Sequence, residues 1–166
     1  MLGKEMLTAM FAFSNAMNLH LLDCADRVSE EQLDAPSEYS EGGIRVTLRH
    51  VLGVEWEWGT MGRTRKALTS PPPFFQNPTL AAMRGIAAEE AAAMRTFLDG
   101  ATDNDLRESF AVERSGRTKR FVVWEVLVHR AYHSAQHRSE AADLLTQYGQ
   151  SPGDMDFLYF LHPELR

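Results

Sequence analysis

The sequence has almost no cysteine, since Cys24 is the only one among 166 residues. A chain with one cysteine can form neither an internal disulfide nor a thiolate cage around a metal ion. Cys24 lies between Asp23 and Asp26, whose negative charges disfavour a thiolate, so we expect a buried or inert thiol. Because nothing in the cysteine usage suggests an oxidising compartment, the expected location is the cytoplasm.

Long hydrophobic runs and an excess of positive charge are also absent. No apolar run approaches the roughly 20 residues that a membrane-spanning helix needs, and the short run over residues 7–13 does not resemble a signal peptide. Seventeen Lys and Arg residues against 23 Asp and Glu residues give a net charge of −6. Nucleic acid and anionic membranes require a cationic surface. We therefore expect neither of them among the partners.

Most of the sequence shows helical periodicity instead. Apolar residues recur at spacings of three and four, which is typical of amphipathic helices. Asn77 and Pro78 look like a cap and a first-turn proline, and Ser29 with Gln32 forms a capping-box pattern that predicts a short helical turn. The long helices are predicted over about residues 4–27, 46–61, 78–98 and 122–148, with one last turn within 154–161.

The connections complete the predicted architecture. Three successive prolines, residues 71–73, exclude a helix interior and predict a long loop. Residues 110–121, with Ser115 and Gly116 near their middle, predict a small hairpin or an excursion. Strands do not alternate with helices, which disfavours a doubly wound α/β sheet. We predict an all-α fold: an up-down-type four-helix bundle with one longer connection and a short C-terminal helical turn, forming a single domain over residues 1–166.

Three of the six histidines fall within nine residues of the last long helix. These are His129, His133 and His137, and a spacing of four places neighbouring imidazoles about 5–6 Å apart at Cβ on one helix face. Two of them can bind one metal ion, as in helical zinc motifs. All three cannot, because the stripe drifts around the helix. His50 is the best candidate for a ligand from elsewhere, since it replaces an apolar residue in another amphipathic helix. A lone histidine is more often a surface or hydrogen-bonded residue, but this combination favours a metal site.

Several other sites are excluded or disfavoured. The sequence contains no Glu-x-x-His and no His-Glu-x-x-His, which excludes the ligands of ferritin-like di-iron bundles and of common zinc proteases. Residues 149–153 match Gly-x-Ser-x-Gly, but a long helix precedes the serine where a nucleophile elbow requires a strand. We expect the basic segments 63–66 and 114–120 to be solvated loop faces. Three tryptophans are expected in the core, with at most one of the first two facing a metal cavity: Trp56, Trp58 and Trp124.

At these residues the chain resembles the DinB-like (DinB/YfiT) superfamily of bacterial four-helix metal-binding proteins. The main resemblance is the stretch from Leu127 through the three spaced histidines to Gly149, and residues 47–53 are similar to the family's second-helix segment. Residues 13–22 and the tail through Tyr159 resemble its first helix and final turn. The family's metal triad then falls on His50, His133 and His137, with His129 as an upstream neighbour.

One departure from the family pattern concerns the residues after the triad. Ser139 and Glu140 stand where Gly and Gln are common, and Glu140 lies close enough to support His137 or to add a carboxylate oxygen to the metal shell. Three neutral imidazoles suit zinc or nickel as the single divalent ion, while iron or manganese becomes more favoured if Glu140 joins.

The resemblance implies three hypotheses about function. The first is an enzyme whose metal ion holds a low-molecular-weight thiol for transfer to a small-molecule substrate, as in related transferases. The second is a metal-dependent hydrolase, with Glu140 or Glu55 as the proton acceptor. The third is a non-catalytic metal-binding or stress-response protein. A homodimer is expected from the resemblance and from the general frequency of symmetric dimers.

Overall fold

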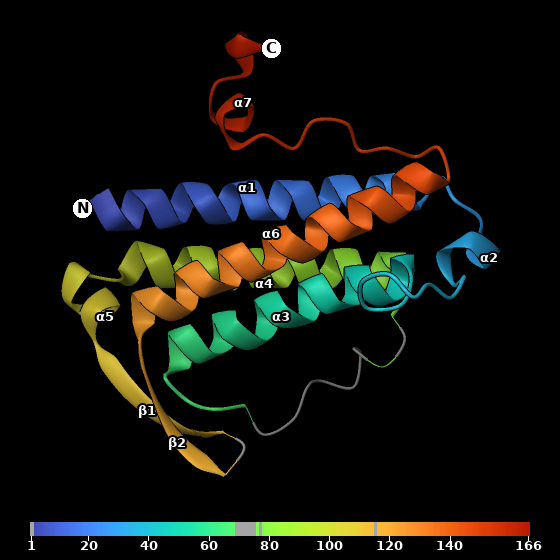
Figure 1. Ribbon diagram of the computed structural model, residues 1–166. Helices are drawn as coiled ribbons and strands as arrows, with labels where there is room; N and C mark the ends of the chain where they lie inside the picture. The colour runs from blue at the N-terminus through green and yellow to red at the C-terminus, as the bar shows by residue number, and fades with distance from the viewer. Residues whose placement is uncertain (1, 69–75, 77, 115) are drawn as a thin grey trace.

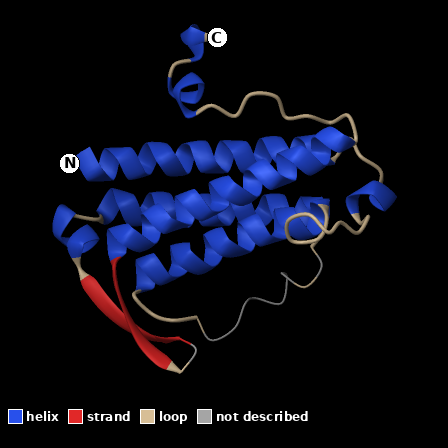
Figure 2. Cartoon of the chain, in the orientation of Figure 1, coloured by secondary structure: helices blue, strands red, loops and turns tan. Residues whose placement is uncertain are grey.

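Four long helices form the frame of the chain: α1 (Leu2–Ala25), α3 (Ile44–Thr64), α4 (Leu80–Gly100) and α6 (Val123–Gln147). The computed structural model describes residues 2–68, 76, 78–114 and 116–166. Helices α1 and α3 each pack against both α4 and α6, so that the four helices enclose a common core (Figure 1). Figure 2 shows that helices dominate the chain and that the two strands lie at one end of the bundle. The predicted all-α helical bundle is confirmed.

The helix directions follow from contacts near the helix ends. Lys4, in the first turn of α1, donates a hydrogen bond to the carbonyl oxygen of Asp99 at the end of α4 (2.8 Å), so α1 and α4 are antiparallel. Arg49, early in α3, donates to the carbonyl oxygen of Gln76 just before α4 (3.1 Å). Helices α3 and α4 therefore run in the same direction, and the end of α3 and the start of α4 lie at opposite ends of the bundle (Figure 1).

The short elements lie at the ends of the bundle and along one side. Ser29 caps α2 (Glu30–Leu33) and makes the predicted capping box with Gln32. Between α4 and α6 come α5 (Asp103–Arg107) and an antiparallel hairpin of β1 (Ser109–Arg114) and β2 (Arg117–Val122), in which Phe110 pairs with Phe121. Of the two alternatives predicted for residues 110–121, a hairpin or an excursion, the chain adopts the hairpin. Helix α5 was not predicted. The tail forms α7 (Phe157–Leu161) and a 3₁₀ turn, Pro163–Leu165, which confirms the predicted last turn.

Two apolar clusters fill the bundle, one at each end. One contains Leu21, Leu48, Met83 and Leu145, one residue from each long helix. The other cluster also contains residues from all four long helices, among them Met94 of α4. Each long helix contributes buried polar side chains at or next to the positions between its contributions to the two clusters. We call this set the polar layer; it comprises Ser14, Asn18, Glu55, Glu90, Arg130, Ser134 and Arg138. Among the described residues, no helix combines the length and the apolarity needed to cross a membrane.

Three expectations about individual segments need correction. Trp124 is 46% exposed and so does not belong to the core, because it lies in the first turn of α6 on a face that no other element covers fully. The segment 63–66 is only partly the solvated loop expected: Thr64 and Lys66 are exposed, but α3 continues to Thr64, and Arg63 donates two hydrogen bonds to the buried carboxylate of Glu90 (2.6 and 2.9 Å). Helix α4 begins at Leu80 and not at Pro78, because Thr79 is its cap and the Thr79 side chain accepts a hydrogen bond from the amide of Ala82.

The remaining segment predictions have mixed outcomes. Residues 117–120 of the second basic segment are exposed as expected, but they belong to strand β2 rather than to a loop. Cys24 is buried, as predicted. The predicted cap at Asn77 and the proline loop at residues 71–73 lie outside the described residues.

Candidate metal centre

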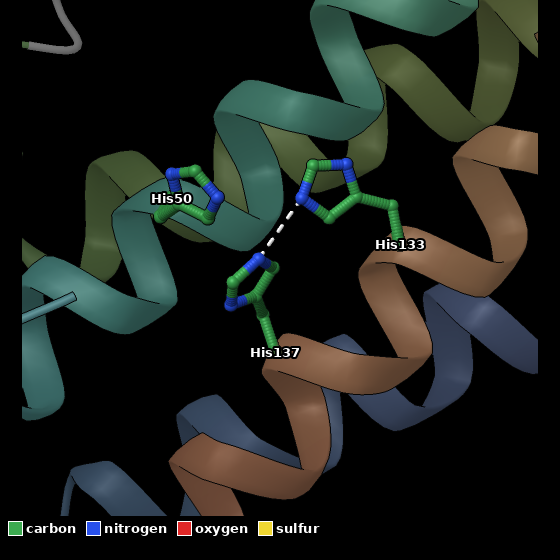
Figure 3. A group of neighbouring side chains, drawn as sticks. All are labelled: His50, His133 and His137. Atoms are coloured by element: carbon green, nitrogen blue, oxygen red, sulfur yellow. Dashed lines mark hydrogen bonds between the residues drawn. The ribbon is translucent and has the colours of Figure 1, made fainter. Parts of the chain in front are cut away.

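The three predicted ligands meet where α3 packs against α6. His50 comes from the second turn of α3, and His133 and His137 come from successive turns of α6 (Figure 3). One ring nitrogen of each histidine lies within 4.8 Å of the chosen nitrogens of the other two. The Nε2 atoms of His133 and His137 are 2.9 Å apart, and the His50 ring lies 4.3 Å from that of His137 between centroids. The structure therefore brings together the residues that the helix spacing and the resemblance singled out.

An unpartnered nitrogen in this cluster tests whether it fits a metal ion. Nε2 of His50 is buried and has no hydrogen-bond partner within the described part of the chain. Leaving a buried polar atom without a partner is unfavourable by about 1–3 kcal/mol. The facing Nε2 atoms of His133 and His137 can share one proton or direct both lone pairs at one cation. A divalent metal ion fits this donor set, because it would take lone pairs from all three rings at once.

Glu140 fixes the orientation of the His137 ring. Nδ1 of His137 donates a hydrogen bond to Oε2 of Glu140 (2.6 Å), which places the proton on Nδ1 and leaves the Nε2 lone pair facing the cluster. Ser40 also donates to Oε2, and Gln136 donates to Oε1 (3.3 Å). Burial disfavours the charged form of Glu140, but the hydrogen bonds from Ser40, His137 and Gln136 outweigh it and lower the pKa of this carboxyl. Two roles were considered for Glu140: supporting His137, or adding a carboxylate oxygen to the metal shell. The structure shows the contact that the first role requires.

Burial keeps two of the rings in the neutral form that binds metals. It lowers the pKa of His50, an effect that Glu41 opposes from 3.7 Å and that neighbouring His137 reinforces. Burial also lowers the pKa of His133, and the other histidines around it act in the same direction. Protons therefore compete less well for these nitrogens than for those of an exposed histidine.

His129 lies one turn before the cluster on the same stripe. Its ring packs edge-on against Trp58 at 4.5 Å between centroids and lies 5.3 Å from the ring of His133. The group of three ligand nitrogens does not include it. His129 therefore precedes the cluster on α6 without belonging to it, as the resemblance implies. Trp58 contacts this row of histidines through the His129 ring.

The polar layer is the part of the molecule that the sequence analysis missed. Glu55, which we considered as a proton acceptor, accepts hydrogen bonds from Ser14 (2.6 Å), Asn18 (3.0 Å), Arg130 (3.1 Å) and Arg138 (3.1 Å). Burial alone would raise the pKa of Glu55, but the two arginines and these hydrogen bonds hold it below its ordinary value. Its oxygens are therefore already occupied, which argues against the proton-acceptor role.

A signal for this layer does exist in the sequence. Arg130, Ser134 and Arg138 recur at a spacing of four, one residue after each of the three spaced histidines. This second polar stripe lies beside the first on α6, at positions where an amphipathic helix would otherwise place apolar residues. Ser40 and Glu41, in contrast, come from an irregular segment before α3 that carries no recognisable pattern.

The comparisons with known proteins agree with this geometry. The model of the DinB family matches residues 3–165, nearly the whole chain. The chain belongs to the DinB family. The comparison with curated proteins found no match. The coarser part of our functional prediction is therefore confirmed: this is a DinB-family helical bundle with a three-histidine cluster that could hold a metal ion.

Proposed function

We propose that this DinB-family protein binds one divalent metal ion, zinc or nickel by preference, through His50, His133 and His137. The observation that carries the proposal is the convergence of three ring nitrogens from two helices within 4.8 Å. The unpartnered, buried Nε2 of His50 supports it, since a ligand is the simplest partner for that atom. Three imidazoles also leave coordination positions open, which is the pattern of catalytic rather than structural sites.

We further propose that the bound ion serves a thiol-dependent transfer to a small molecule. When bound, the metal would lower the pKa of a coordinated thiol and supply it as a nucleophile near neutral pH. The role of Glu140 is to hold the His137 ring and its Nδ1 proton in place. The role of the neutral rings of His50 and His133 is to offer lone pairs.

The occupied carboxylates favour a thiol over water as the nucleophile. In metal-dependent hydrolysis a nearby base commonly takes a proton from the metal-bound water, and the two residues considered for that role were Glu55 and Glu140. Glu55 accepts hydrogen bonds from four side chains, and Glu140 accepts them from three. A thiol is acidic enough to lose its proton on metal binding without such a base.

A cobalt-substituted protein tests this proposal directly. We expect 2-mercaptoethanol to add a thiolate-to-metal charge-transfer band, whereas ethylene glycol, its hydroxyl counterpart, does not. The His129→Ala variant is the matched control and should respond like the wild type, because His129 lies outside the cluster. If the thiol leaves the spectrum unchanged while the three histidines still bind cobalt, the transferase proposal is wrong and a non-catalytic metal-binding role is favoured.

Two other expectations stay predictions. The homodimer, with the bacterial cytoplasm as its location, rests on the resemblance and on general frequencies. Light scattering at micromolar concentration would test the dimer, and a monomer would contradict it.

A further inference from the structure

A cavity of about 360 Å³ opens between α1 and α4. Its walls are largely apolar and include Phe11, Met94 and Leu98, while its lining also contains Glu55 and Arg130 from the polar layer. The three histidines of the candidate metal centre lie between α3 and α6 and are not among the residues that line it. This cavity is therefore separate from the metal centre, and its volume falls at the lower end of the range for small-molecule pockets, roughly 300–1,000 Å³.

The buried charged side chains next to this cavity include more arginines than carboxylates. Arg63 pairs with Glu90, Arg138 pairs with Glu55, and Arg130 shares both carboxylates, with its Nη2 at 3.1 Å from Glu55 and 3.7 Å from Glu90. Three guanidinium groups thus share two carboxylates. Burial raises the pKa of Glu90, although its contacts with Arg63 and Arg130 oppose this shift.

The positive charge without full compensation lies on Arg130. Its side chain is 4% exposed, and its Nε and Nη1 atoms are buried with no hydrogen-bond partner in the described ranges. The ring of Phe11 covers the guanidinium at 4.6 Å, so both side chains belong to the wall of the same cavity. A buried positive charge without full compensation is unfavourable, and an anion would relieve it.

We propose that the cavity between α1 and α4 binds a small monocarboxylate with a short apolar chain. The carboxylate accepts a hydrogen bond from Nε or Nη1 of Arg130, the two atoms that Glu55 and Glu90 leave without a partner, and the chain lies against Phe11, Met94 and Leu98. The apolar walls select against inorganic anions, which would lose their hydration there without gaining contacts. Arg95, which also lines the cavity and is exposed, adds positive charge at its entrance.

Isothermal titration calorimetry with hexanoate and hexan-1-ol tests this site. The two probes share the same chain, so their difference isolates the carboxylate. We expect hexanoate to bind at least about tenfold more tightly, as one charge-assisted hydrogen bond predicts. Equal affinities, or no binding of hexanoate, would overturn the proposal.

Two variants on α4 provide the control for location. Ala91 lines the cavity, so Ala91→Leu should fill it and abolish hexanoate binding, whereas Ala92→Leu on the exposed neighbouring position should not. Hexanoate binding that survives Ala91→Leu would place the ligand elsewhere, including at the histidine cluster, and would contradict the proposal. Arg130→Gln should remove the preference for hexanoate over hexan-1-ol. Since this change can also unfold the polar layer, Ala91→Leu remains the decisive variant.

Discussion

Nδ1 of His137 lies 2.6 Å from Oε2 of Glu140, one turn further along the same helix. This contact determines which nitrogen of His137 carries the proton, and it therefore determines that Nε2 faces His50 and His133. The same carboxylate is held in turn by Ser40 from the segment before α3. Glu140 thus connects α6 with the segment before α3 around the cluster.

Removing this support should weaken metal binding without abolishing it. We expect Glu140→Ala to lower the zinc affinity by about 10- to 100-fold, the usual effect of losing a carboxylate that orients a histidine ligand. Competition with a chromophoric chelator measures the change. Ser139→Ala, at the exposed neighbouring position, is the control and should match the wild type. An unchanged affinity in Glu140→Ala would show that the hydrogen bond to His137 has no role in binding.

The pKa shifts of the cluster predict how the metal-free protein responds to acid. Burial lowers the pKa of His133 in the folded protein, so the unfolded chain binds more protons as the pH falls below about 6.5. The contribution of His133 to stability is therefore present above its ordinary pKa and is lost on acidification. We expect the free energy of unfolding, measured with urea in the presence of a chelator, to fall less steeply between pH 7 and pH 5 in His133→Asn than in the wild type. A slope that does not change would contradict the assigned direction.

The cluster was predictable because it follows a local pattern on α6, whereas the polar layer depends on contacts between helices. Spacing identified the row of His129, His133 and His137, and the family resemblance selected the last two. His50 stood out as a polar residue on an amphipathic helix. Glu55 carries no comparable signal, since its partners lie 37 to 83 residues away in sequence. Ser40 was missed for the same reason, because its contact with Glu140 spans 100 residues.

The errors in the sequence analysis have similar causes. Arg63 belongs to a basic segment that resembles a surface loop, but its partner Glu90 lies on another helix. Trp124 was placed in the core because of its residue type, although the side chain lies at the start of α6 where neighbouring elements leave it exposed. Residue type and periodicity identify a helix and its general apolar face, but they do not identify the partner that each side chain meets.

Two glycines offer a matched test of packing around the polar layer. A Cβ at Gly59 of α3 would overlap with Oε1 of Glu90, whereas a Cβ at Gly85 of α4 would meet no atom within 4 Å. We expect Gly59→Ala to destabilise the protein by displacing Glu90 from Arg63. Gly85→Ala should stabilise it by up to about 1 kcal/mol, the difference in helix propensity. Urea denaturation measures both changes, and a Gly59→Ala variant as stable as the wild type would contradict the close packing of this layer.

The measurement that tests the central claim most directly is the metal content of the purified protein and its variants, determined by elemental analysis after loading with zinc and removal of the excess. With the cluster formed by His50, His133 and His137, we expect about one equivalent in the wild type and in His129→Ala, and a large loss in each of His50→Ala, His133→Ala and His137→Ala. Circular dichroism of each variant confirms that it is folded. If folded His133→Ala and His137→Ala retain the wild-type metal content, the three histidines do not form the metal site.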